Sequence, residues 1–321
     1  MPHSSPTILT ITLNPALDKS SKVDRIIPEQ KLMCTSTHID AGGGGINVAK
    51  AIHRLGGKVN ALFTAGGYSG EVLQQLIQAE NIPHTCIPTQ NNTRENTIIV
   101  EKSTNFQYRF GMQSTAISPT DIQNILTKIK ESTASIIVIS GSIPIGTPVE
   151  IYNEIAQIAT KKNAKCIVDT SGEALESVYK ENIYLLKPNL QELYKLAKVD
   201  ALEIHEVDDV ARELLHKSKC EMIAVSLGSQ GAIIVTKNHC EHLPAPPVHK
   251  KSTVGAGDSM VGGMVWALAH KKTLSQVLRW GVACGAAATM NEGTHLFEKE
   301  QAEKLYQWLK KYGEKFKIAL E

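Results

Sequence analysis

The residues best suited to chemistry lie together near the C-terminus, in the sequence STVGAGDS at positions 252–259. An apolar run, residues 260–269, follows directly and is predicted to be a helix. Small residues at the start of a helix leave its backbone N–H groups uncovered. Together with the helix dipole, these groups form an anion hole suited to a phosphoryl group. Gly255 and Gly257 allow close approach, because a Cβ at either position would collide with the phosphate.

Asp258 would lie in the first turn of this helix, beside the anion hole. There its carboxylate can accept the proton of an attacking hydroxyl, while the amides of Gly255, Ala256 and Gly257 stabilise the transferring phosphoryl group. The alternative is structural, a glycine-containing helix cap with Asp258 as the capping carboxylate. Because short glycine motifs are common, the segment alone leaves both interpretations open.

A second motif, KPNLQE at positions 187–192, directly follows a predicted strand. Asn189 and Glu192 have the spacing of a capping box at the start of a helix, which is a structural role. The functional alternative is that they organise Mg²⁺ and its waters beside the phosphates of ATP, since hard cations prefer oxygen ligands. A third motif, SLGSQG at 226–231, is either a simple hairpin or the glycine-rich turn at which nucleotides dock in α/β sheets.

Two motifs in the N-terminal half indicate a site for a sugar. Asp18 ends the sequence NPALD, which follows the first predicted strand. It either holds sugar hydroxyls or lies in a solvated Asn-Pro turn. Four glycines at 42–45 open an amphipathic helix. Each helical glycine costs roughly 1 kcal/mol, so we infer that a ligand approaches the backbone there. Asn47, one turn into this helix, could hydrogen-bond the sugar.

The glycine run does not fit a dinucleotide-binding site. It does not follow the first strand directly, and residues 60–67 contain no acidic residue to hold a ribose. The chain also lacks a Walker A motif and the signatures of protein kinases. Lys31, Arg94 and Arg109 would together suit a substrate that carries a phosphate, although each alone is an ordinary surface residue.

The elements that must position these motifs alternate along the chain. Short apolar runs are predicted to be buried strands, and the segments between them have helical periodicity. This alternation indicates an α/β fold of right-handed βαβ units, with a mainly parallel central sheet and helices on both faces. We expect strands at 7–13, 60–64, 135–140, 165–169, 183–186 and 222–226, and helices at 46–55, 70–80, 120–131, 148–160, 208–217, 255–269, 274–291 and 299–312.

Two stretches, residues 20–40 and 92–112, interrupt this alternation with β-forming and polar residues. Within the second, 97–101 and 107–110 are expected to form a hairpin that turns near Thr104 and Asn105. We therefore expect a single domain over 1–321, with a discontinuous small β-sheet lid at about 15–40 and 92–112 that covers a ligand.

The composition argues against several classes of function. The 321 residues carry a formal net charge of +2 without a basic stripe, so no nucleic-acid partner is expected. The six scattered cysteines form no Cys-x-x-Cys pair, which is typical of reduced thiols in a cytosolic protein. No apolar run is long enough to span a membrane, and residues 1–6 lack the pattern of a signal peptide. We expect a cytoplasmic protein without a membrane partner.

Taken together, these motifs resemble the PfkB branch of the ribokinase-like carbohydrate kinases. The resemblance covers nearly the whole chain and implies a ribokinase-like core, the cofactors ATP and Mg²⁺, and phosphorylation of a sugar hydroxyl. It rests on motifs that occur in the family's order at 14–18, 42–49, 140–142, 187–192, 226–231 and 253–258.

The resemblance also implies a role for individual residues. Asp258 would be the catalytic base, and the amides of Gly255, Ala256 and Gly257 the anion hole. The nucleotide would be bound by Lys187, Asn189, Ser226, Gly228, Gly231 and Thr253, and Mg²⁺ by Asn189 and Glu192 through water. The sugar phosphate would be held by Asp18, Lys31, Gly43, Asn47, Arg94 and Ser140. Lid sheets of the family commonly pair between subunits, which implies a homodimer in which Lys31 reaches the neighbouring subunit's site.

The glycine run GGGGINVA is most similar to the minor 6-phosphofructokinase isozymes of this family, so fructose 6-phosphate is the expected substrate. The alternatives are 1-phosphofructokinases and tagatose-6-phosphate kinases, which tend to place a lysine within this run. Met33 departs from the pattern, because it stands where the resembling isozymes have a second lid arginine, and Ile145 replaces a proline. A non-catalytic sugar or nucleotide sensor on the same fold is a further alternative, against which the intact Asp258 argues.

Overall fold

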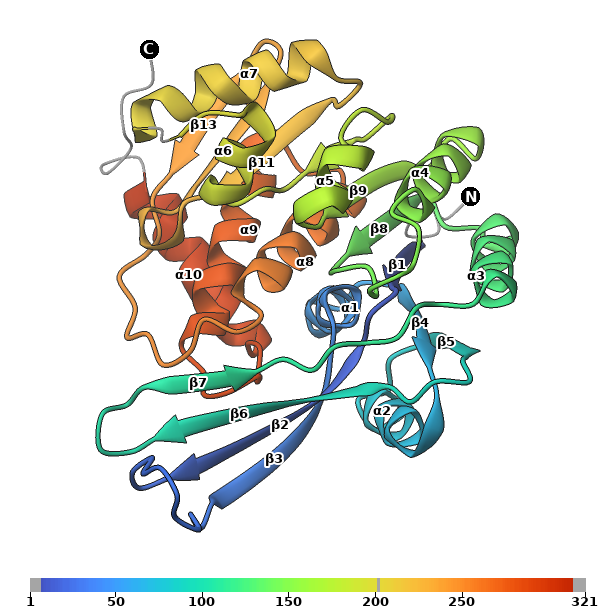
Figure 1. Cartoon of the computed structure of the whole chain (residues 1–321). Helices are drawn as coiled ribbons and strands as arrows, with labels where there is room; N and C mark the ends of the chain where they lie inside the picture. The colour runs from blue at the N-terminus through green and yellow to red at the C-terminus, as the bar shows by residue number, and fades with distance from the viewer. Residues whose placement is uncertain (1–6, 201–202, 314–321) are drawn as a thin grey trace.

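A nine-stranded sheet forms the centre of the molecule (Figure 1). The structure is a computed structural model that describes residues 7–200 and 203–313, so the segment 1–6, where no signal peptide is expected, lies outside it. The strand order is β13-β12-β11-β10-β9-β8-β1-β4-β5. These strands are β1 (Ile8–Thr12), β4 (Val59–Ala65), β5 (His84–Pro88), β8 (Ile136–Ser140), β9 (Lys165–Asp169), β10 (Leu185–Leu186), β11 (Met222–Ser226), β12 (Ala232–Thr236) and β13 (Cys240–Leu243).

The sheet is parallel from β11 to β5, and only β12 and β13 add antiparallel pairs at one edge. A parallel sheet needs cover on both faces, which is why its strands are apolar on both sides. In β8, for example, Ile136 and Val138 face one core and Ile137 and Ile139 the other. The predicted mainly parallel α/β core is therefore confirmed.

Helices cover both faces of the sheet (Figure 1). On one face lie α1 (Gly44–Arg54), α2 (Gly67–Ala79), α8 (Ala256–Ala269), α9 (Leu274–Thr289) and α10 (Lys299–Tyr312). On the other lie α3 (Pro119–Glu131), α4 (Ile151–Lys161), α5 (Gly172–Val178), α6 (Leu190–Ala197) and α7 (Val207–Lys217). Among the described residues, no helix has the length and apolar character needed to cross a membrane.

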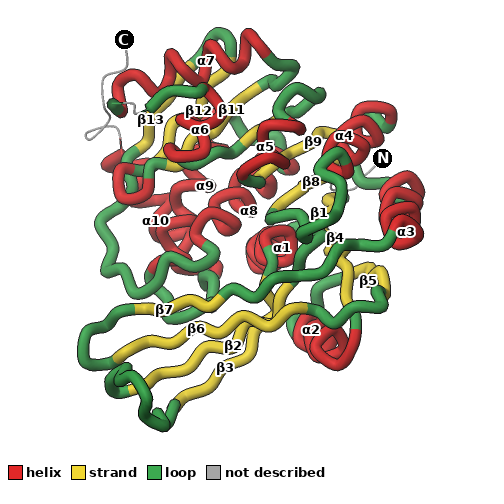
Figure 2. The backbone as a smooth tube through the Cα atoms, viewed as in Figure 1, coloured by secondary structure: helices red, strands yellow, loops and turns green. Residues whose placement is uncertain are grey.

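A separate four-stranded sheet projects from this core, and Figure 2 shows its yellow strands side by side. Its order is β3-β2-β6-β7, formed by β2 (Ala16–Val23), β3 (Thr35–Gly42), β6 (Arg94–Glu101) and β7 (Gln107–Phe110). β6 and β7 make the expected antiparallel hairpin, and β2 pairs in parallel with β6. The small sheet predicted from the two irregular stretches is present, and we call it the lid.

Several local predictions were wrong. The strand expected at 183–186 is only the pair Leu185–Leu186, and the helix expected to begin at position 148 begins at Ile151. The strand β5 and the helix α5 were not anticipated, because each is a short element with few buried residues. Their type is decided by neighbouring strands and helices rather than by local pattern.

Candidate active site

The anion-hole segment adopts the expected turn at the start of α8. Gly255 is the N-cap residue, with a φ of 69° in the left-handed region that favours glycine. A Cβ at this position would also lie 2.4 Å from Cδ2 of Leu296. Ala256 and Gly257 then begin the helix, and Asp258 is in its first turn. The turn therefore presents helix N-terminal amides next to a carboxylate, as the sequence predicted.

Asp258 is held in place from α1. The side-chain amide of Asn47 donates a hydrogen bond of 2.9 Å to Oδ2 of Asp258. Burial raises the pKa of Asp258 to about 7, and the nearby carboxylate of Asp169 acts in the same direction. The Asn47 hydrogen bond and the charge of Lys187 act in the opposite direction. A carboxylate with a pKa near neutrality is suited to accept and release a proton.

A buried ion pair adjoins the anion hole. Nζ of Lys187 lies 3.0 Å from Oδ1 of Asp169, and both side chains are largely buried. Burial is the largest single influence and lowers the pKa of Lys187, but the charge and hydrogen bond of Asp169, together with the charges of Glu192 and Asp258, outweigh it, so the pKa of Lys187 is raised and the amine stays charged. A Cβ on Gly257 would lie 3.7 Å from Nζ, which places this ammonium beside the anion hole. Sequence reasoning missed Asp169, whose only signal is that it ends a buried strand.

Asn189 and Glu192 form the capping box of α6. The Asn189 side chain accepts a hydrogen bond from the amide of Glu192 (2.9 Å), and Glu192 accepts one from the amide of Asn189 (2.8 Å). Burial raises the pKa of Glu192. The structural interpretation is thus confirmed, but Oε1 of Glu192 is not used by the capping box, and Oδ1 of Asn189 has a second lone pair.

The same two residues fit a water-mediated magnesium site. Within the described part of the chain, no group of three or more His, Cys, Asp or Glu is arranged to hold a metal ion. Mg²⁺ usually keeps several waters and uses one or two carboxylates together with substrate phosphates, so this finding is compatible with the donor set of Asn189 and Glu192.

A cavity of about 790 Å³ opens next to the anion hole, which is large enough for a nucleotide. The predicted residues Ser226, Gly228, Gly231 and Thr253 line it, whereas Lys187 and Asn189 do not. Sequence reasoning missed the wall supplied by α9 and by the segment before the anion hole, which consists of Pro246, Pro247, Val248, Val282, Gly285, Ala286 and Thr289.

The predicted sugar residues meet where the lid joins the core. Asn96 on β6 donates to Oδ1 of Asp18 (2.8 Å), and Arg94 donates to the carbonyl of Asn14 (3.2 Å). Burial raises the pKa of Asp18. Ser140, at the end of β8, is buried, and its hydroxyl has no hydrogen-bond partner among the described residues. Its polar group is therefore available to a ligand.

The glycine run lets α1 begin against this polar group. A Cβ on Gly44 would lie 2.4 Å from Oγ of Ser140, and one on Gly42 would lie 2.1 Å from Oδ2 of Asp18. Gly43 has a φ of 122°, a conformation that other residues rarely adopt. These positions require glycine because protein groups approach closely, in addition to any approach by a ligand.

Lys31 is not brought to this site within one chain. It is exposed in the loop between β2 and β3, which Figure 1 shows at the end of the lid far from the core, whereas Asp18 is near the start of β2. Arg109, by contrast, reaches the anion-hole segment from β7 and donates to the hydroxyl of Thr253 at 3.3 Å. One lid cation thus approaches the phosphate side of the site.

Comparisons with known proteins agree with this geometry. Residues 11–301 match the family described as pfkB family carbohydrate kinase. The chain is 41% identical over 304 residues to the ATP-dependent 6-phosphofructokinase isozyme 2 of Escherichia coli (strain K12), which covers 94% of this chain and 98% of that protein. It resembles the crystal structure of phosphofructokinase-2 from Escherichia coli in complex with fructose-6-phosphate, with a TM-score of 0.90, 39% identity, and coverage of 95% and 99%. A 1-phosphofructokinase of Borreliella burgdorferi is 32% identical over 287 residues, 88% of this chain and 92% of that protein.

We predict that Lys187→Met destabilises the protein by about 3–5 kcal/mol, because it leaves a buried carboxylate unpaired. The loss should be smaller at pH 5 than at pH 8. Lys187 also stabilises the ionised form of Asp258, because its charge lowers the pKa of this second carboxyl. At pH 8 Asp258 is ionised and loses that stabilisation in the variant, whereas at pH 5, below its pKa of about 7, it is protonated and loses nothing. Urea unfolding at both pH values measures the effect. The double variant Lys187→Met/Asp169→Asn is the control and should recover part of the loss, and a single variant as stable as wild type would contradict the prediction.

Proposed function

The chain belongs to the pfkB family of carbohydrate kinases, and from this premise we propose that it transfers the γ-phosphoryl group of ATP to fructose 6-phosphate, giving fructose 1,6-bisphosphate. The observation that carries the proposal is the position of Asp258, a carboxylate with a pKa of about 7 directly beside the anion hole. The choice of sugar is supported by the relatives from Escherichia coli, one of which is a complex with fructose-6-phosphate.

In the proposed mechanism the chain supplies a base, an anion hole and a lid that covers the substrates. Asp258 accepts the proton of the sugar's primary hydroxyl as its oxygen attacks the γ-phosphorus in line, and the bond between this phosphorus and the β,γ-bridging oxygen breaks to release ADP. The amides of Gly255, Ala256 and Gly257 stabilise the charge on the transferring group. Mg²⁺, when held through water by Asn189 and Glu192, would neutralise part of the charge on the phosphates. The lid excludes water and so limits hydrolysis of ATP.

The residues of the two substrate sites fit this reaction. The cavity beside Thr253 would take the nucleotide, with its phosphates toward Lys187. Asp18, Asn47 and Ser140 gather around the start of α1, next to Asp258, where a sugar's hydroxyls would be held. Arg94 would face the phosphosugar from the lid strand β6. The proposed substrates, ATP and a sugar phosphate, are charged metabolites of the cytoplasm, which supports the cytoplasmic location expected from the sequence.

Phosphorylation of another sugar phosphate is the second candidate, because the relatives include 1-phosphofructokinases. The reaction at Asp258 would be the same, and only the position of the sugar's own phosphate would differ. Tagatose 6-phosphate remains an alternative within the class. The non-catalytic sensor is disfavoured, because a binding protein has no need of a carboxylate poised near neutral pKa beside an anion hole.

We expect coupled-assay kinetics to give the highest kcat/KM with fructose 6-phosphate, among fructose 6-phosphate, fructose 1-phosphate, tagatose 6-phosphate and fructose. Unphosphorylated fructose should be at least about tenfold poorer, since it forfeits charge-assisted hydrogen bonds. Preference for another phosphosugar would keep the mechanism and change the substrate. Absence of turnover with every compound would reject the kinase proposal in favour of the sensor.

We predict that Asp258→Asn lowers kcat by about 10²–10⁴-fold, the usual contribution of a general base. ATP binding, measured by calorimetry, should be nearly unchanged, because the cavity that would hold the nucleotide does not include this side chain. In the wild type, kcat/KM should fall as the pH decreases through about 7, since protonated Asp258 cannot accept a proton. Near-normal turnover in the variant would refute the assignment of the base.

We also propose that two copies of the chain pair through their lids. Large apolar side chains exposed on a surface mark interfaces. On the lid and its adjoining loops they are Ile27, Met33, Ile39, Phe106, Tyr108, Phe110 and Met112. A second copy would also explain Lys31, which is remote from the site of its own chain. A tetrameric inhibited form is known for the phosphofructokinase-2 of Escherichia coli, so a relative does self-associate.

Sedimentation velocity should show a dimer for the wild type and a monomer for Phe110→Lys, because a buried charge without a partner disrupts an apolar interface. The matched control is Ile145→Lys, since Ile145 is exposed in the loop after β8, outside the lid. A wild-type protein that sediments as a monomer at micromolar concentration would contradict the proposal.

A further inference from the structure

The loop between α9 and α10, residues 290–298, lies between the lid and the anion-hole segment. It follows Thr289, which lines the cavity assigned to the nucleotide, and it precedes the last described helix. The motifs that defined the site do not include it. Its side chains and backbone nevertheless make contacts in both directions, toward the lid and toward the anion hole.

On the lid side, the loop contacts both β2 and β3. Nζ of Lys22 on β2 lies 2.6 Å from Oε2 of Glu292. The hydroxyl of Thr294 donates a hydrogen bond to the carboxylate of Asp40 on β3. Gly293 lies between these two contacts, and a Cβ on it would be 3.6 Å from Oγ of Ser20. The loop therefore follows the movement of these two strands wherever these contacts persist.

These contacts are close to the sugar residues. Asp40 is directly opposite Asp18 in the register of β2 and β3, and its charge is one of those that raise the pKa of Asp18. Lys22 is four residues beyond Asp18 on the same strand. A ligand held by Asp18 would therefore act on the strand segment that touches the loop.

On the core side, the loop supports the anion-hole turn. Oγ of Ser252, a buried residue, donates to the carbonyl of Gly293 at 2.9 Å and accepts from the amide of Val254 at 3.2 Å. The side chain of Leu296 lies against Gly255, the N-cap residue of α8. A displacement of the loop would thus shift the residues whose amides face the phosphoryl group.

We propose that Lys22, Glu292 and Thr294 are positioning residues that couple the lid to the anion hole through this loop. The inference rests on the proposed function. When the lid covers the sugar, the ion pair and the Thr294 hydrogen bond hold the loop against Ser252 and Leu296. The anion-hole turn is then fixed at the time the phosphoryl group is transferred, which is how positioning contributes to catalysis.

The charges around Glu292 suit this role. Hydrogen bonding and charge from Lys22 lower the pKa of Glu292, and the charges of Lys251 and His38 add to the effect. Lys251 is in the segment that leads into the anion hole, and His38 is on lid strand β3. The carboxylate of Glu292 therefore faces positive charges from both the lid and the segment that leads into the anion hole.

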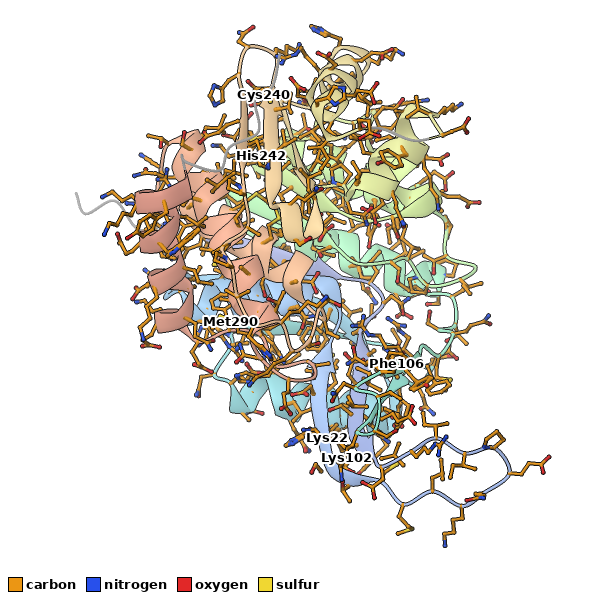
Figure 3. All side chains as sticks on the ribbon, turned by 90° about the vertical axis from the view of Figure 1, so that its left-hand side faces the viewer. Lys22, Lys102, Phe106, Cys240, His242 and Met290 are labelled. Carbon is orange, nitrogen blue, oxygen red and sulfur yellow. The ribbon has the colours of Figure 1, made fainter. Side chains whose placement is uncertain are left out.

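The lid offers a matched control. Lys102 and Asp24 form an ion pair of 2.9 Å between exposed side chains, and both residues belong to the lid and its turns. Figure 3 shows Lys22 and Lys102 next to each other, and Met290, the first residue of the loop, above them. The two pairs are alike in chemistry and place, but only Lys22 contacts the loop.

The test is a double-mutant cycle in the full chain with Lys22→Met and Glu292→Gln, assayed with ATP and fructose 6-phosphate at low ionic strength. Each single variant should lower kcat by about two- to fivefold, the range for an exposed ion pair, and leave KM for ATP unchanged. The double variant should be no slower than the slower single variant. The charge exchange Lys22→Glu/Glu292→Lys should recover activity, whereas Lys102→Met and Asp24→Asn should stay close to wild type.

Hydrogen exchange gives a readout that does not depend on turnover. Amides in residues 252–259 should exchange faster in Lys22→Met, Glu292→Gln and Thr294→Val than in wild type, and at the wild-type rate in Lys102→Met. Additive kinetic effects, or exchange equal to that of the control, would overturn the coupling. If the wild type turns over no sugar phosphate, the proposed function fails, and the exchange experiment alone decides whether the loop links lid and anion hole.

Discussion

The site is organised around one buried ammonium group and the carboxylates that surround it. Lys187 pairs with Asp169 and also acts on Glu192 and Asp258. Carboxylates this close raise one another's pKa, and burial raises it further. Without Lys187 the pKa of Asp258 would rise above its value of about 7, and this proposed base would be mostly protonated under neutral conditions. Lys187, together with the Asn47 hydrogen bond, therefore helps to keep the proposed base ionisable near neutral pH, whereas the charge of Asp169 acts in the opposite direction. The remaining excess of negative charge supports the proposed water-mediated cation beside Glu192.

The position of this base depends on how closely two helices approach. A Cβ on Gly262 of α8 would lie 2.4 Å from the Cβ of Ala51 on α1, so small residues at the crossing bring the helices together. Asn47 is one turn before Ala51 and can reach Asp258 only because of this approach. The neighbouring Gly263 has the same function toward α9, where a Cβ would meet the carbonyl of Trp280. These two glycines serve packing, and so does Gly255, where a Cβ would meet Leu296 rather than a phosphate as expected from the sequence, while Gly257 leaves the backbone open at the anion hole.

Residues that form continuous motifs were predictable from the sequence, and residues assembled from separate elements were not. The segment 252–259 and the turn at 226–231 are recognised from adjacent residues, and the structure has Asp258 in the first turn of α8 and the turn beside the cavity. Asp169 was missed because a single acidic residue after a buried strand carries no motif. The α9 wall of the cavity was missed because its small apolar residues are indistinguishable from core residues. Asn189 and Glu192 show a different limit, since a capping box and a metal site call for the same residues at the same spacing.

The contact between Lys22 and Glu292 could not be predicted from the sequence. The two residues are 270 positions apart, and each belongs to an ordinary polar stretch. Exposed ion pairs contribute little to stability, so such a contact would have little effect on the fold. Its effect on the anion hole would be larger than its energy suggests, since small displacements of groups that stabilise a transition state change the rate strongly. A kinase also gains from a weak link, because a lid that opens to release product cannot be bound tightly to the core. Contacts of modest strength along the loop satisfy both requirements.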